Sequence, residues 1–142
     1  MRINLRIYNE KQVITGINSY KLEKIEAVKK VVNRTAARVE RGAKKRAPVD
    51  EGRLRSSIHM RPFRGGLEID VGTNVEYGVY QEFGTGIYAV NGDGRKTPWA
   101  YIHPKTKKLV WTRGNRPQPF LFPAFEAVKP DFVPELKKAL KG

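Results

Sequence analysis

The chain begins with an alternation of apolar and polar residues. Ile3, Leu5 and Ile7 alternate with arginine and asparagine. A period of two places alternate side chains on opposite faces of an extended segment, so this pattern predicts a half-buried strand.

The pattern then changes to a helical spacing that continues for about 26 residues. Asn18 or Ser19 can cap the start of this helix, and Pro48 ends it at about residue 47. Apolar residues recur every three or four positions, which predicts one buried stripe along a long amphipathic helix. The expected buried residues are Leu22, Ile25, Val28, Val32, Ala36, Val39 and Ala43.

Beyond the helix, short apolar runs separated by turn residues predict two β-hairpins. The first joins residues 58–63 to residues 67–71 through Gly65-Gly66, a strong turn signal. The second joins strands around 99–101 and 109–111.

Short helices are expected in the remaining segments. Residues 75–83 carry aromatic side chains at helical spacing, and Pro123 suits the first turn of a helix through Val128. Pro130 is expected to break that helix, leaving a separate last helix at residues 134–141. Together the elements predict an α+β fold, in which one long amphipathic helix packs on a mostly antiparallel sheet with short additional helices.

Length and composition narrow the classes of protein that remain. The 142 residues are enough for one domain, so residues 1–142 are expected to form a single α+β unit. The chain has no cysteine, which excludes a disulfide framework, a thiolate zinc site and a cysteine nucleophile. No apolar run approaches the ~18 residues that span a bilayer, so no membrane association is expected.

Charge is the most extreme property of the sequence. The net charge is +14, and the calculated pI is about 10.2. Residues 65–94 nevertheless contain five acids and no lysine or arginine, between two strongly basic flanks. This segmentation indicates either two faces of opposite sign, as head-to-tail contacts require, or local solubility alone. The overall charge indicates nucleic acid or another acidic partner.

A basic stripe lies opposite the apolar face of the long helix. Its three arginines have a spacing that suits phosphate contacts, although any solvated helix face carries charges. The candidates for contact with DNA or an acidic partner are Lys30, Arg34, Arg38, Arg41 and Lys45.

Candidate catalytic and metal-binding residues are few. His59 is expected on a strand and His103 at a turn, and neither has a proton-transfer partner nearby in sequence. Several acids have the oxygen ligands that a hard cation prefers, but the solvated face of a strand explains Glu68 and Asp70 more simply. We therefore expect no enzymatic activity, no cofactor and no metal.

Three short strings are unusual in combination. They occupy residues 48–58, 77–85 and 119–124, and each combines turn residues with apolar or aromatic anchors. Their characteristic residues are Pro48, Asp50, Gly52, Leu54 and Ser57 in the first, Tyr77, Tyr80, Glu82, Phe83, Gly84 and Thr85 in the second, and Pro119, Phe120, Pro123 and Ala124 in the third.

Taken in this order, the strings resemble the tail-completion or head–tail joining proteins of long-tailed bacteriophages and prophages. The resemblance covers about residues 36–128. Relative to a minimal version of that family, residues 1–18 form an N-terminal strand extension. Residues 87–116 form an inserted mobile loop and hairpin.

The resemblance implies a non-enzymatic virion protein at the junction of tail and head, made in the host cytoplasm. It would form a ring, a hexamer, around the channel through which the double-stranded DNA passes. The implied partners are copies of the chain, the tail-tube protein, the head connector or stopper protein, and DNA. A sequence-nonspecific nucleic-acid-binding protein and a small basic ribonuclease are the alternatives that the composition leaves open.

Overall fold

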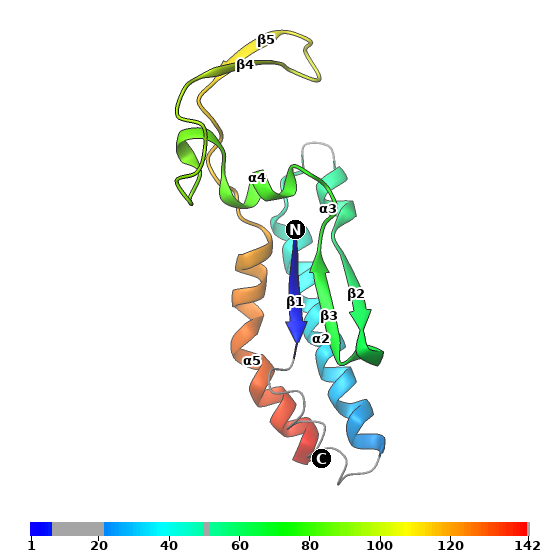
Figure 1. The fold of residues 1–142 in the computed structure, drawn as a ribbon. Helices are drawn as coiled ribbons and strands as arrows, with labels where there is room; N and C mark the ends of the chain where they lie inside the picture. Colours follow the sequence, from blue (N-terminus) through cyan, green and yellow to red (C-terminus); the bar gives the residue numbers. More distant parts are fainter. Residues whose placement is uncertain (7–21, 50–51, 142) are drawn as a thin grey trace.

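The computed structural model describes residues 1–6, 22–49 and 52–141, and confirms an α+β fold (Figure 1). Its elements are β1 (Arg2–Arg6), α2 (Leu22–Arg46), α3 (Arg53–Ser57), β2 (His59–Phe63), the 3-10 turn η1 (Arg64–Gly66), β3 (Glu68–Gly72), α4 (Gly78–Phe83), the 3-10 turn η2 (Gly86–Tyr88), β4 (Trp99–Ile102), β5 (Leu109–Thr112) and α5 (Leu121–Lys141).

The main sheet is antiparallel, with strand order β1-β3-β2. Ile3 lies opposite Val71 and Leu5 lies opposite Ile69, and all four side chains are buried. The intervening positions carry polar side chains, as the alternation in the sequence predicts. The sheet therefore has one apolar face, which α2 covers (Figure 1).

The polar face of the sheet is held by a cluster around Asp70. Arg61 Nη2 lies 3.3 Å from Asp70 Oδ2, and Asn4 Nδ2 donates a hydrogen bond to the other carboxylate oxygen. Arg2 Nε lies 3.9 Å from the same carboxylate. Burial lowers the pKa of Arg2, the positive charge of Arg61 acts in the same direction, and Asp70 opposes both. Asp70 is thus engaged within the chain.

The buried face of α2 agrees with the predicted stripe from Val28 onward, and Ile25 is partly buried against the core. The buried residues are Val28, Val31, Val32, Thr35, Ala36, Val39 and Ala43. Leu22 is 77% exposed, so the prediction that it is buried is wrong. Twenty-five helical residues span about 37 Å, whereas five-residue strands span about 17 Å, so the helix extends past the sheet. The expected caps, Asn18 and Ser19, lie outside the described residues.

The C-terminal segment is one helix, not two. α5 runs from Leu121 to Lys141 with Pro130 and Pro134 inside it, so the expected break at Pro130 is wrong. Both prolines are exposed, which leaves the carbonyl groups that lose a hydrogen bond on the solvated side. Apolar side chains on the other side, including Phe132 and Leu136, pack against the core. This packing holds the helix together across the prolines.

Helices α2 and α5 pack closely along their length and make the most extensive contact between any two elements. Gly42 lies at their crossing, where an added Cβ would stand 3.2 Å from Ala124 Cβ. Small residues at both positions let the two backbones approach. The core therefore lies between the sheet, α2 and the first half of α5.

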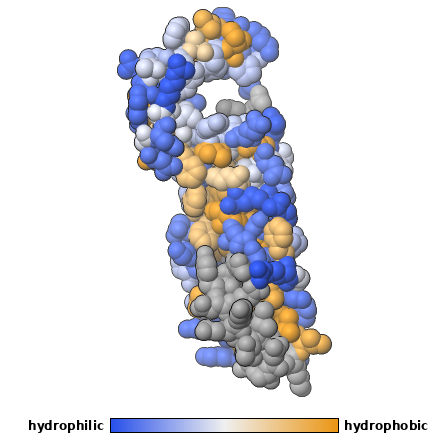
Figure 2. Space-filling model, in the orientation of Figure 1, coloured by the Kyte–Doolittle hydropathy of each residue, from blue (hydrophilic) through white to orange (hydrophobic). Residues whose placement is uncertain are grey.

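The second hairpin forms a separate two-stranded sheet, β4–β5, as predicted. It projects beyond the end of the helices and curves over α4 (Figure 1). In the space-filling view, apolar residues gather on the hairpin, and a hollow separates it from the body (Figure 2). The expected mobility of residues 87–116 stays a prediction.

Candidate functional site

The three sequence strings meet at one end of the molecule, where α2 ends and α5 begins. In the first string, Gly52 has φ +66°, the left-handed region that glycine adopts most readily, and α3 follows directly. Leu54 in α3 is 2% exposed and belongs to the core. Pro48 is half-buried just beyond α2, and Asp50 lies outside the described residues.

Ser57 links the first string to the loop that precedes α4. Its hydroxyl donates a hydrogen bond to the Leu54 carbonyl at 2.6 Å and lies 2.5 Å from Thr73 Oγ1. Thr73 is fully buried, and its hydroxyl accepts a hydrogen bond from the Val75 N–H. This chain of hydrogen bonds fixes the start of the second string against α3.

The second string forms α4 and the tight turn after it. Gly78 packs against Thr73, where an added Cβ would lie 2.8 Å from Thr73 Cγ2. Gly84 ends α4 with φ +77°. Thr85 then bonds to Asn115: its backbone N–H donates to the Asn115 carbonyl, and its hydroxyl accepts the Asn115 N–H at 2.8 Å. The second string therefore also anchors the segment that follows β5 at the end of the hairpin insertion.

Glu82 joins the second string to the third. Its side chain is 3% exposed, and its carboxylate accepts three backbone hydrogen bonds at the start of α5. Phe120 and Leu121 donate to Oε2 at 2.8 and 2.9 Å, and Phe122 donates to Oε1 at 2.9 Å. The first N–H groups of a helix have no partner within the helix, and negative charge is favourable there. Glu82 is thus the N-terminal cap of α5, supplied from 38 residues away.

The third string supplies the apolar part of this joint. Phe120 is fully buried and Ala124 is 1% exposed, both within the core. Pro123 occupies the first turn of α5, as expected, and Pro119 lies in the extended segment before the helix. The buried residues of the three strings therefore stabilise the fold of the chain itself.

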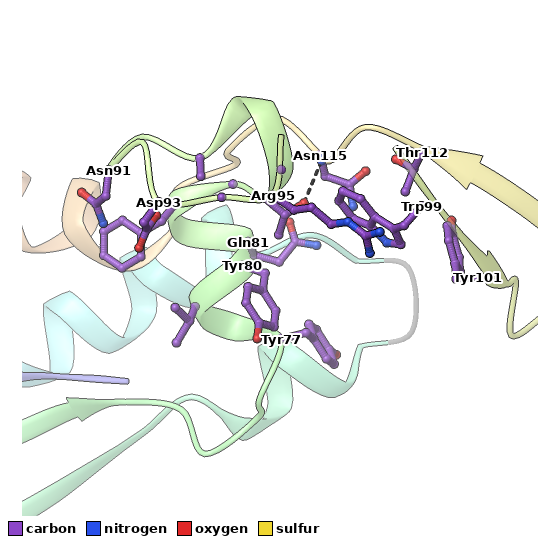
Figure 3. Close-up of a pocket in the computed structure, with 17 residues that line it drawn as sticks. Tyr77, Tyr80, Gln81, Asn91, Asp93, Arg95, Trp99, Tyr101, Thr112 and Asn115 are labelled. Carbon is purple, nitrogen blue, oxygen red and sulfur yellow. Dashed lines mark hydrogen bonds between the residues drawn. The ribbon is translucent and has the colours of Figure 1, made fainter. Parts of the chain in front are cut away.

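Two exposed members, Val79 and Tyr80, lie on α4 along a groove beneath the hairpin. Val79 and Tyr80 are 40% and 58% exposed, and both line this groove of about 620 Å³. Figure 3 shows Tyr77, Tyr80 and Gln81 on one side and Arg95, Trp99 and Tyr101 on the other. The ring of Phe83 contacts that of Phe122, with centroids 5.8 Å apart.

The opposite wall of the groove is one face of the β4–β5 hairpin. Paired residues of an antiparallel ladder point to the same side, so Trp99 shares a face with Thr112, and Tyr101 with Val110. The Arg95 guanidinium lies 5.6 Å from the centre of the Trp99 ring. Among the described residues that line it, the groove therefore combines aromatic rings with amide groups, one cation and the Asp93 carboxylate.

The structure divides the basic stripe of α2 into two groups. Arg34 and Arg38 form ion pairs with carboxylates on α5: Arg34 binds Glu135 at 3.3 Å, and Arg38 binds Asp131 at 3.0 Å and Glu135 at 3.4 Å. The remaining three are exposed, and within the described ranges none of them forms an ion pair. These are Lys30, Arg41 and Lys45.

The two histidines serve local turns. His103 Nδ1 accepts hydrogen bonds from the backbone N–H groups of Lys105 and Thr106, which closes the hairpin turn. His59 Nδ1 lies 2.7 Å from the Ser57 carbonyl oxygen. Among residues 1–6, 22–49 and 52–141, no group of three or more histidine or acidic side chains is arranged to hold a metal ion.

Sequence reasoning missed the role of Glu82, although one local signal pointed to such a residue. Residues 116–120 precede α5 and contain no serine, threonine, aspartate or asparagine that would cap it. A buried helix start without a local cap requires an acceptor from elsewhere in the chain.

In the described part of the chain, no helix is long and apolar enough to cross a membrane.

Comparison with protein families gave a match over the first part of the chain. The sequence profile of the HK97-gp10-like family, described as "Bacteriophage HK97-gp10, putative tail-component", matches residues 11–84. A search of curated proteins gave no match. A search of solved structures gave none either. The match covers more than half of the chain, from before α2 to Gly84 in the second string. This chain belongs to the HK97-gp10-like family of bacteriophage tail components.

Proposed function

We propose that this chain completes the phage tail and joins it to the head connector, as a ring of copies around the DNA channel. Its partners in this proposal are copies of itself, the tail-tube protein, the head connector or stopper protein, and the double-stranded DNA. The protein acts as a structural part of the virion and catalyses no reaction.

The joint made by the three strings is the observation that carries the proposal. Glu82, Ser57 and Thr85 are engaged in hydrogen bonds that fix one end of the molecule, and none of them is paired with a histidine. Beside this rigid joint lie exposed apolar side chains on α4 and on the hairpin. A rigid scaffold that displays apolar surface suits a protein whose task is to hold neighbours.

Deletion of the gene from its phage tests this proposal. We expect DNA-filled heads and free tails to accumulate without joining, which electron microscopy of the lysate counts directly. A plasmid copy of the wild-type gene should restore joined particles. Joined, infectious particles at the normal yield in the deletion strain would refute the proposal.

The cationic surface favours a second candidate, a sequence-nonspecific nucleic-acid-binding protein. Residues 95–116 contain seven lysines and arginines and no acid, and Lys30, Arg41 and Lys45 add exposed cations on α2. Binding through phosphates weakens steeply as salt rises. Filter binding of duplex DNA across a salt series tests this candidate, and retention that does not change with salt would contradict it.

A further inference from the structure

The β4–β5 hairpin has an apolar face that nothing in the described chain covers. Ala100 lies opposite Trp111, and Ile102 lies opposite Leu109, so these four side chains share one side, here named the outer face. Ile102, Leu109 and Trp111 are 59%, 62% and 69% exposed. Figure 2 shows apolar residues gathered on this part of the hairpin.

This outer face points away from the chain's own groove. The opposite face, with Trp99 and Tyr101, lines that groove beneath the hairpin (Figure 3). A two-stranded sheet on its own is at best marginally stable in water, and an exposed apolar strip of this kind marks an interaction site. Because no residue of the described ranges covers the outer face, the occupant proposed for it is a second molecule.

Charge indicates what that occupant is. The hairpin segment 95–116 has seven cations and no acid, whereas segment 65–94 has five acids and no cation. Surfaces of opposite sign on one molecule suit contacts between copies. Nucleic acid would satisfy the cations, but it would leave the three large apolar side chains of the outer face exposed to water.

Only some of the chain's carboxylates are available to a neighbour. Glu68 and Asp70 are held by arginines of the same chain, and Glu82 is buried in the joint. Among the described residues of the acidic segment, Glu76 and Asp93 form no ion pair. Both lie close to α4, since Glu76 precedes it by two residues and Asp93 lines the groove beside it.

Exposed apolar side chains lie in the same place. Val79, Tyr80 and Phe122 are 40%, 58% and 43% exposed, and together they form what is here named the α4 face. Phe122 joins α4 through its ring contact with Phe83. Glu126, one helical turn beyond Phe122, is exposed and forms no ion pair within the described ranges. The α4 face thus combines apolar surface with carboxylates, the complement of the cationic hairpin.

We propose that the outer face of one copy packs on the α4 face of the next copy. The inference deepens the proposed function, because it names the surfaces that join copies in the ring. The two surfaces differ, so the contact is head-to-tail and continues from copy to copy until a ring closes. Val79 and Tyr80 also line the groove beneath the hairpin, so the proposed contact includes one wall of that groove.

Cysteine cross-linking tests this contact cleanly, because the chain has no cysteine of its own. A mixture of Leu109→Cys and Tyr80→Cys chains at millimolar concentration is oxidised, and the disulfide-linked heterodimer is measured on a non-reducing gel. The control replaces Tyr80→Cys by Val133→Cys, a position of similar exposure (53%) on α5. We expect at least tenfold more heterodimer from the 109–80 pair than from the 109–133 pair.

The double variant Tyr80→Cys/Leu109→Cys should give a ladder of oligomers, in solution or in purified phage particles. A ladder in either preparation supports the contact. Equal yields for the two pairs and no ladder in either preparation would overturn it. A disulfide formed within a single chain would overturn it as well, since the hairpin would then reach its own α4.

Charge reversal provides a second, independent readout. Lys107→Glu/Lys108→Glu in the Leu109→Cys chain should lower the heterodimer yield, and Asp93→Lys/Glu126→Lys in the Tyr80→Cys chain should restore it. No restoration would contradict the pairing of these surfaces. The gene deletion tests the head–tail role separately. If heads and tails stay unjoined in the deletion strain but the specific cross-link does not form, this contact alone is refuted. If the cross-link forms but the deletion strain joins heads and tails normally, only the proposed function is refuted.

Discussion

Removal of the Glu82 carboxylate should destabilise the protein far more than removal of an exposed carboxylate from α5, the helix that Glu82 caps. Glu82→Ala leaves three backbone N–H groups at the start of α5 without an acceptor. Two of these belong to Phe120 and Leu121, which are fully buried, so water cannot replace the carboxylate without opening the core.

The size of the loss follows from known costs of such groups. A hydrogen bond to a charged group contributes about 1.5–3 kcal/mol, and an unsatisfied buried donor costs about 1–3 kcal/mol. Three such bonds share one carboxylate and are not additive, so we expect a loss of about 3–5 kcal/mol in the free energy of unfolding. Glu82→Gln keeps one acceptor oxygen but places an amide N–H₂ against N–H donors, and it should lose about 2–3 kcal/mol.

Urea denaturation followed by circular dichroism measures these changes. Glu126→Ala is the matched control, since it removes an exposed carboxylate from α5, the helix that Glu82 caps, and should change stability by less than about 0.5 kcal/mol. A loss for Glu82→Ala below about 1 kcal/mol, or equal to that of the control, would refute the role of Glu82 as the cap of α5.

Three further substitutions test other parts of the structure. At Gly114 (φ +130°) an added Cβ would overlap the Thr85 carbonyl oxygen, whereas at Gly92 (φ +70°) it would meet nothing within 4 Å. Gly114→Ala should therefore abolish the near-ultraviolet dichroism of the two hairpin tryptophans and Gly92→Ala should keep it; equal spectra would contradict the close approach. Pro130→Ala/Pro134→Ala should raise the free energy of unfolding by about 1–3 kcal/mol in urea denaturation, because it restores hydrogen bonds in a continuous helix; a decrease would indicate that the helix breaks there. Arg38→Ala should lower stability by about 1 kcal/mol at low salt and by less in 0.5 M salt, as roughly expected for a partly exposed ion-pair network; a loss independent of salt would argue against ion pairing.

Local periodicity was enough to predict α2 and both hairpins. In α2 and in strands β1 and β3 the pattern that selects the conformation also selects the buried face, as in the pairing of Ile3 with Val71, whereas Ile102, Leu109 and Trp111 of the second hairpin are exposed. The prediction failed at Leu22, because the sequence does not say where the short strands beneath the helix stop.

Contacts between distant segments explain the other differences. The rule that proline breaks a helix applies to a helix without tertiary contacts. At Pro130, α5 stays continuous because it packs against the core. Helical spacing grouped Arg34 with the exposed stripe, but the carboxylate that binds it lies 101 residues further along the chain. Glu82 likewise acts on a helix that begins 39 residues later, which no local pattern contains.

The position of the chain in the virion tests the central claim most directly. Lys141, at the exposed end of α5, allows a short C-terminal tag that leaves the joint at the other end of the helix intact. Gold labelling of purified phage through this tag, viewed by electron microscopy, should place label at a single site on each particle, where the tail meets the head. Label spread along the tail, or particles that carry none, would contradict the account.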